Sequence, residues 1–203
     1  MKKFLLLTFA LSLSFLAQAQ GALEDFAGQL TGGEVSFKYS FEVQGDVPVK
    51  GSGTAVLKGN AFHIFGNGLE IWCDGKTRWT IDRGSREAYI ETVETESVDY
   101  LANPATLLGA LTRAFQINSV SDVTLSGKKL QAFNLTPSID DTGLKSVMLY
   151  MDGSTPSRVA ITVEDGTKTL FRLSDYAVKE KSDAGFSFDI ASLGSDFVVT
   201  DLR

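Results

Sequence analysis

The chain has 203 residues, of which 43% are hydrophobic and 22% charged, and its formal net charge is −6. Its 14 phenylalanines and only 4 prolines indicate a chain that buries a large apolar core, which excludes an intrinsically disordered protein. The acidic balance excludes nucleic acid and anionic lipid headgroups as expected partners, because both require a basic protein surface.

The first residues have the pattern of a secretory signal peptide. Two lysines precede an uncharged apolar run, and the run closes on Ala17-Gln18-Ala19, small residues at the two positions that signal peptidase recognises. The run is shorter than the about 20 residues that span a membrane, although a retained N-terminal anchor is the alternative. No Cys follows the cleavage point to carry a lipid anchor. We therefore expect residues 1–19 to be removed and residues 20–203 to form one soluble, monomeric domain.

The expected domain begins with a short helix and a regular strand. Apolar residues at helical spacing predict a helix over residues 22–30. In residues 35–44 every second residue is apolar, which is the period of a strand with one dry face and one wet face. The apolar positions of this strand are Val35, Phe37, Tyr39, Phe41 and Val43.

Further short strands follow, separated by turn residues such as Asn67-Gly68 and Asp152-Gly153. Such short turns join antiparallel neighbours. The expected strands are 50–58, 61–65, 69–72, 77–82, 87–93, 123–125, 129–136, 144–151, 158–163, 169–176, 185–189 and 197–200. About eleven strands are more than a flat open sheet usually carries without curling. The sequence therefore predicts a mainly β (α+β) domain built on a single curled antiparallel sheet.

The middle of the chain breaks the strand pattern. Asn103-Pro104 suit the N-cap and first position of a helix. The apolar residues that follow at helical spacing are Leu107, Leu108, Leu111 and Phe115. The apolar face of a curled sheet must be covered, so we expect this helix to close the open end of the sheet. Beneath the helix the sheet encloses either a filled core or a hollow apolar pocket.

The residue types give no positive support for catalysis. The only histidine, His63, and the only cysteine, Cys73, lack a third group to orient a nucleophilic pair, and they are too few for an ordinary zinc site. We expect Cys73 to be buried and inert and His63 to lie on the polar face of a strand. No nucleophile elbow, phosphate-binding loop or dinucleotide fingerprint is present. We therefore predict a protein that is not an enzyme and that uses no metal and no cofactor.

One hairpin, over residues 68–82, is more specific than the rest. It consists of a strand, an Asp-Gly-Lys-Thr turn and a second strand with an aromatic residue, and its characteristic residues are Asp74, Gly75, Lys76 and Trp79. This segment resembles the outer-membrane lipoprotein carrier protein (LolA-like) family, which has a D-G-K-x-x-W hairpin at this place. The order of other motifs is also similar: Gly51-Ser52-Gly53 before the hairpin, a Pro-led leucine-rich helix after it, and an F-x-F…V-x-V-x-D tail.

The resemblance implies both a fold and a function. Members of this family have an unclosed β-barrel with helices as a lid, and an apolar cavity that shuttles lipoprotein acyl chains across the periplasm. It implies acylated lipoproteins or other lipids as cargo, and an inner-membrane release complex and an outer-membrane acceptor as partners. In this chain the five apolar residues of 35–44 would form the cavity wall and the four of the middle helix would line the lid. Ordinary core packing is the alternative for each of the nine, and the hairpin residues would be structural.

The stretch after the second strand departs from the family pattern. Proteobacterial members have an Arg-Pro pair there, and that Arg secures the lid through hydrogen bonds. The matching residues 57–62 contain neither, and Lys58 is a point donor without the planar fork of a guanidinium. We therefore expect a divergent member of the family. A lipid- or lipoprotein-binding sensor of the same fold is the alternative to a carrier, and an unrelated secreted enzyme or filled β-domain is the third interpretation.

Overall fold

The computed structural model describes residues 21–45, 48–93, 107–108, 110–111, 114–139, 142–180 and 185–203. The predicted signal peptide, residues 1–19, lies outside these ranges. So does most of the predicted middle helix, of which Leu107, Leu108 and Ala110 are described and helical.

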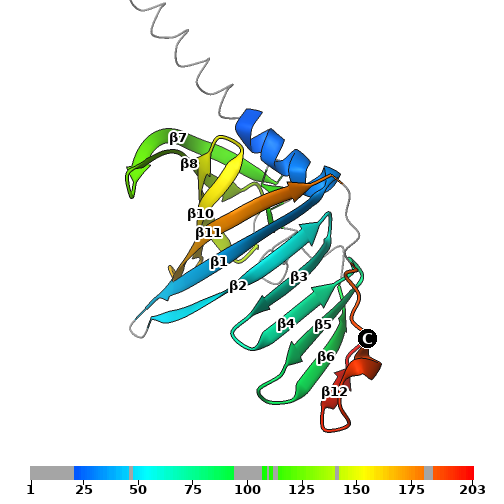
Figure 1. The fold of residues 1–203 in the computed structure, drawn as a ribbon. Coiled ribbons are helices and arrows are strands. Elements are labelled where there is room, and N and C mark those ends of the chain that lie inside the picture. Colours follow the sequence, from blue (N-terminus) through cyan, green and yellow to red (C-terminus); the bar gives the residue numbers. More distant parts are fainter. Residues whose placement is uncertain are drawn as a thin grey trace, which may run out of the picture.

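The described strands form one curled sheet that does not close into a barrel (Figure 1). Their order in the sheet is β12-β6-β5-β4-β3-β2-β1-β11-β10-β9-β8-β7. Their bounds are β1 Glu34–Gln44, β2 Val49–Lys58, β3 Ala61–Gly66, β4 Leu69–Cys73, β5 Thr77–Asp82, β6 Glu87–Thr92, β7 Phe115–Leu125, β8 Lys128–Pro137, β9 Leu144–Asp152, β10 Thr155–Val163, β11 Lys168–Lys179 and β12 Val198–Asp201. Neighbours pair antiparallel except β12, which lies parallel to β6. The prediction of a single curled, mainly antiparallel sheet is confirmed.

Two local predictions are wrong. Phe115, expected in the middle helix, is the first residue of β7, and Leu111 lies in a turn. The cause is a bulge between Ile117 and Ser119, which interrupts the alternation by which a strand is recognised. The predicted strand over residues 185–189 has no strand pairing.

The core lies on the concave side of the sheet, where a helix over residues 21–32 covers one end (Figure 1). Leu23, Phe26 and Leu30 of this helix are at most 3% exposed, as expected from their helical spacing. The backbone N–H of Gly59 donates to the carbonyl of Leu30 at 2.9 Å, so the helix is also attached to the β2–β3 turn.

Tyr176 of β11 is a second attachment point of this helix. Its hydroxyl donates to Oε1 of Gln29 at 2.7 Å, its ring lies 6.4 Å from that of Phe26, and burial raises its pKa. Tyr176→Phe is expected to lower the free energy of unfolding by about 1 kcal/mol, the contribution of a typical hydrogen bond. Urea unfolding measures this change. Tyr89→Phe is the control, because the Tyr89 hydroxyl bonds to Glu87 on the exposed surface; an equal loss in both variants would contradict the assignment.

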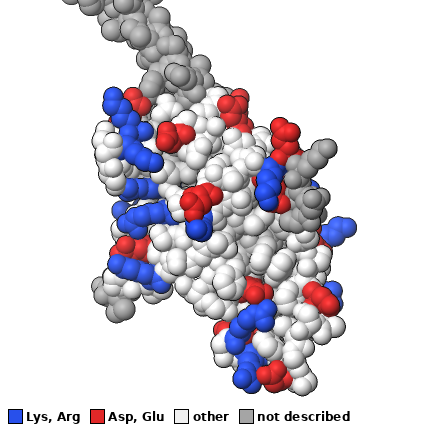
Figure 2. Space-filling view, in the orientation of Figure 1, with Lys and Arg blue, Asp and Glu red and all other residues white. Residues whose placement is uncertain are grey.

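The outer surface carries charges of both signs close together (Figure 2). Nζ of Lys38 lies 2.8 Å from Oδ2 of Asp175, and Nζ of Lys50 lies 3.3 Å from Oε1 of Glu42. Exposed pairs of this kind contribute only about 0–1 kcal/mol each. The stability of the sheet therefore comes mainly from its buried concave face.

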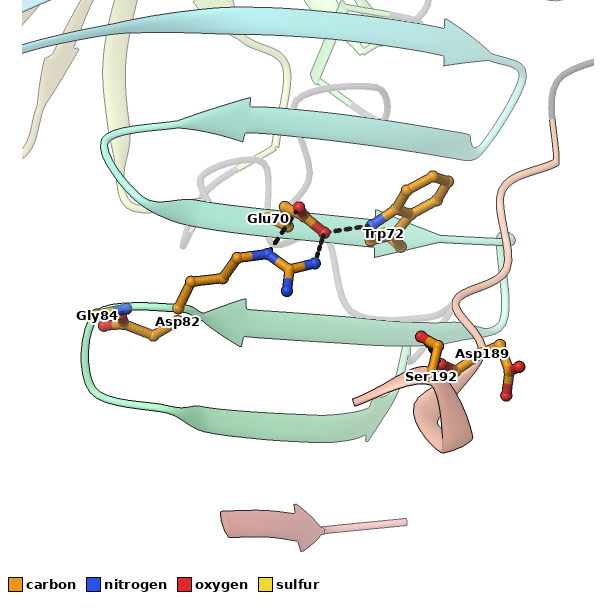
Figure 3. A network of polar contacts seen from close by, with 7 residues as sticks. Glu70, Trp72, Asp82, Gly84, Asp189 and Ser192 are labelled. Carbon is orange, nitrogen blue, oxygen red and sulfur yellow. Dashed lines mark hydrogen bonds and ion pairs between the residues drawn. The ribbon is translucent and has the colours of Figure 1, made fainter. Parts of the chain in front are cut away.

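His63 lies on the outer face of β3, opposite the cavity, as predicted, and its neighbours there include aromatic residues as well as the carboxylate of Glu70. The His63 ring stacks on Trp72 with centroids 3.6 Å apart, and Trp72 lies 6.1 Å from Phe188 of the C-terminal segment. Figure 3 shows this segment passing beside Trp72, whose indole Nε1 donates to Glu70 at 3.4 Å. Nε2 of His63 is buried and has no hydrogen-bond partner among the described residues.

Acid is expected to destabilise this outer cluster. Burial lowers the pKa of His63, which the charge of Glu70 partly offsets. The pKa of His63 in the folded protein lies below its unfolded value of about 6.5, so the unfolded chain takes up the proton first as the pH falls. The contribution of neutral His63 to the free energy of unfolding is therefore complete well above pH 6.5 and decreases below it. Urea midpoints measured from about pH 7.5 to 5 avoid most carboxylate titration. His63→Phe should flatten the profile in this range, and an unchanged slope would contradict the explanation.

Candidate functional site

The concave face of the sheet contains an apolar cavity of about 440 Å³. This volume lies within the range of about 300–1,000 Å³ typical of ligand pockets. The cavity is lined by Phe37, Tyr39, Phe41, Val43, Ala55, Leu57, Phe62, Ile64, Ile71, Leu107, Leu108, Val159, Ile161, Thr169, Phe171 and Leu173. Among the described residues that line the cavity, all except Thr169 are hydrophobic and none is charged.

Strand register explains how residues far apart in the sequence form one wall. Phe37 of β1 lies opposite Ala55 of β2, Ala55 opposite Ile64 of β3, and Ile64 opposite Ile71 of β4. Residues directly opposite each other point to the same face of a sheet. One row of the pleat thus places four apolar side chains on the concave side.

Six of the nine residues predicted to form the wall and lid line this cavity. They are Phe37, Tyr39, Phe41, Val43, Leu107 and Leu108. Val35, Leu111 and Phe115 are instead buried in the core at 0%, 1% and 7% exposure and do not line it. The two leucines are the part of the predicted lid whose side chains reach the cavity.

The β1 side of the cavity ends in three neighbouring aromatic rings. The ring of Phe41 lies 6.4 Å from Tyr39 and 5.9 Å from Phe171, and Tyr39 lies 6.3 Å from Phe171. Centroid distances of this size are typical of favourable aromatic pairs. Burial raises the pKa of Tyr39, so its hydroxyl remains a neutral hydrogen-bond donor.

The lining residues of β2, β3, β4, β10 and β11 were not among those proposed from the sequence. Their signal is present in the turns. The Gly59-Asn60 turn pairs Lys58 with Ala61, and counting back along both strands places Ala55 opposite Ile64. The predicted wall rests on the longest alternating segment, residues 35–44, and does not include the strands paired with it.

The characteristic residues of the hairpin that carries the family resemblance, Asp74, Gly75, Lys76 and Trp79, lie outside the cavity lining, although Ile71 of its first strand belongs to it. Oδ1 of Asp74 accepts hydrogen bonds at 2.8 Å from the backbone N–H groups of Lys76 and Thr77, and Gly75 has a φ of 92°, a conformation that favours glycine. Trp79 pairs with Trp72 across β4 and β5.

Cys73, the last residue of β4, is 0% exposed, as predicted. Burial raises the pKa of its thiol. Its Sγ accepts a hydrogen bond from the N–H of Gly75 at 3.4 Å. These features are typical of an inert, structural cysteine.

In the described part of the chain, no three His, Cys, Asp or Glu side chains come together as a metal site requires. No helix within those residues is long and apolar enough to cross a bilayer.

No family model and no curated protein matches the sequence. Solved structures do match. An uncharacterized conserved protein from Thermus thermophilus is similar over 91% of this chain and 99% of its own, with a TM-score of 0.54 and 11% identity. A LolA superfamily protein from Nitrosomonas europaea matches over 84% and 98%, with a TM-score of 0.45 and 12% identity. An outer membrane lipoprotein-sorting protein domain from Vibrio parahaemolyticus matches over 79% and 92%, with a TM-score of 0.44 and 9% identity.

The structural neighbours include the LolA superfamily. Identities of 9% to 12% concern the fold alone. The ligand class of the cavity depends on the residues that line it.

Proposed function

We propose that the protein is a periplasmic carrier that binds the acyl chains of lipoproteins in its apolar cavity and ferries them from the inner to the outer membrane. The observation that supports this most directly is the cavity of about 440 Å³ on the concave face. Each acyl CH₂ group exposed to water costs about 0.8 kcal/mol, so a lipoprotein needs a shielding partner to cross an aqueous compartment.

The chemistry of the lining favours an acyl chain over a polar ligand. The hydroxyls of Tyr39 and Thr169 are the polar side-chain groups among the lining residues. A polar or charged ligand would leave its own groups without partners in such a cavity, which is unfavourable. Binding and release of an acyl chain needs no catalytic group, which agrees with a protein that is not an enzyme.

The proposed location and partners rest on the sequence. The signal peptide predicted over residues 1–19 would deliver the domain to the periplasm. An inner-membrane complex would load it and an outer-membrane acceptor would unload it, as the family resemblance implies.

A lipid- or lipoprotein-binding sensor is the second candidate, because the lid attachment differs from the family pattern. Lys58, at the place where proteobacterial members carry the lid arginine, is exposed and does not line the cavity. The turn that follows instead binds the helix of residues 21–32, through Gly59 and Leu30. A protein with a different lid attachment could retain the ligand and perform another task.

Two measurements test these candidates. Native mass spectrometry of the protein purified from the periplasm should show co-purified lipid, and its absence would contradict both. Depletion of the protein should cause lipoproteins to accumulate in the inner membrane. Lipid binding together with unchanged delivery to the outer membrane would exclude the carrier and favour the sensor.

A further inference from the structure

Two aromatic residues of the cavity wall lie directly opposite strand glycines. Tyr39 of β1 faces Gly53 of β2, and Gly53 faces Gly66 of β3. Phe41, the next residue of β1 on the same face, lies opposite Gly51. Glycine weakens a strand interior and often marks a place where another group approaches the backbone closely.

The rings occupy the space in which β-carbons of these glycines would lie. A β-carbon on Gly53 would be 2.7 Å from the Tyr39 hydroxyl oxygen, and one on Gly66 would be 2.8 Å from the same oxygen. A β-carbon on Gly51 would be 2.7 Å from Cζ of Phe41. Non-bonded carbon atoms are separated by about 3.5–4.0 Å, so any larger residue at these positions would displace a ring.

The backbone dihedral angles do not require glycine at these three positions. Gly51, Gly53 and Gly66 are absent from the glycines with positive φ, such as Gly68 and Gly75. Other residues could adopt the same extended conformation. The requirement for glycine is therefore one of space. It is set at Gly51 by side chains, and at Gly53 and Gly66 by a neighbouring backbone carbonyl oxygen together with the Tyr39 hydroxyl.

We propose that Gly51, Gly53 and Gly66 keep the cavity hollow by allowing the rings of Tyr39 and Phe41 to lie flat on the sheet. Strand side chains normally stand roughly perpendicular to their sheet, and on this concave face upright rings would project into the cavity. With the rings lying across β2 and β3, the space in front of them stays open and sets the length of chain that fits. The assignment of an acyl chain as occupant rests on the proposed function.

Gly51→Ala is the cleanest test. The atoms that its β-carbon would meet belong to the side chains of Phe41 and Asn67, which can move. At Gly53 and Gly66 the closest atoms are the backbone carbonyl oxygens of Phe65 and Ser52, so substitution there would also disturb strand pairing. Gly28→Ala is the matched control, because a β-carbon on Gly28 meets nothing within 4 Å.

Displacement of a fluorescent naphthylamine probe by fatty acids from octanoate to stearate measures the capacity of the cavity. In Gly51→Ala the affinity for stearate should fall about tenfold, equivalent to roughly two methylenes excluded from the cavity, while octanoate binding is unchanged. Gly28→Ala should match the wild type. Gly51→Ala/Phe41→Leu should recover stearate binding, because the shorter side chain leaves the cavity free again.

The outcomes separate this proposal from the proposed function. If the wild type binds no fatty acid, the proposed function as an acyl carrier is contradicted. A crystal structure of Gly51→Ala then tests the role of the glycines alone, because it shows whether the Phe41 ring has turned into the cavity. If Gly51→Ala binds fatty acids of each length as the wild type does, or if its Phe41 ring has not moved, the proposed role of the glycine is overturned. If Gly51→Ala does not fold, Phe41→Leu is used, and an unchanged preference between palmitate and stearate would overturn the proposal.

Discussion

Leu108→Glu is expected to abolish lipid binding by the folded protein. Leu108 lines the cavity and is only 7% exposed, so the new carboxylate would lie among apolar side chains. Burying an unpaired charge costs several kcal/mol, which corresponds to at least about a hundredfold loss of affinity for an acyl chain that competes for the same space. Probe displacement at about pH 8, where an ordinary carboxyl is ionised, measures the loss.

Two variants control for the effect of the charge. Leu108→Met conserves volume and should retain binding, since such swaps usually cost less than about 1.5 kcal/mol. Leu202→Glu makes the same change at a leucine that is 60% exposed, and it should bind lipid like the wild type. Circular dichroism shows whether each variant is folded. Wild-type affinity in a folded Leu108→Glu protein would exclude Leu108 from the binding site.

The regular part of the fold was predictable because local signals agreed. Segments with clean alternation and Gly-containing turns, such as β1 and the β4–β5 hairpin, were predicted to within a residue or two of their bounds. The bulge in β7 removed that local signal. The parallel pairing of β12 with β6 joins segments far apart in the chain, and no turn specifies it.

The hollow of the cavity could not be predicted from alternation. Val35 and Phe37 share one face of β1, yet Val35 is fully buried in the core and Phe37 lines the cavity. The difference depends on where the covering segments fill the concave side, which is a matter of tertiary packing. The glycines of β2 were visible in the sequence, but their role depends on the rings packed against them.

The aromatic cluster on the outer face could not be predicted from the sequence, for a related reason. His63 alternates with the buried Phe62, so a one-sided sheet predicts it on a wet surface. The C-terminal segment covers this part of the outer face through Phe188, which lies against Trp72. Part of a face becomes covered when a distant segment returns to it, and alternation within one strand carries no information about that return.

Phe133→Ala is expected to cause a larger loss of stability than Phe41→Ala or Phe65→Ala. Phe133 of β8 is 0% exposed and packs in the core, away from the cavity lining. Truncation of a core phenylalanine costs about 3–5 kcal/mol, a large part of the about 5–15 kcal/mol by which a domain is stable. Phe65→Ala, at a position 46% exposed, is the control and should cost much less.

The comparison with Phe41→Ala decides whether core and cavity are separate. Phe41 borders open space, so its truncation removes fewer packing contacts and should cost less than about 3 kcal/mol. Phe41→Ala also enlarges the cavity, so it should change the preference among fatty acids. Phe133→Ala should keep the wild-type preference once binding is corrected for the fraction of folded protein. Urea unfolding and probe displacement on the same samples measure both effects. Equal losses of stability in the two variants, with unchanged ligand preference, would mean that Phe41 is an ordinary core residue and that the concave face is filled in solution.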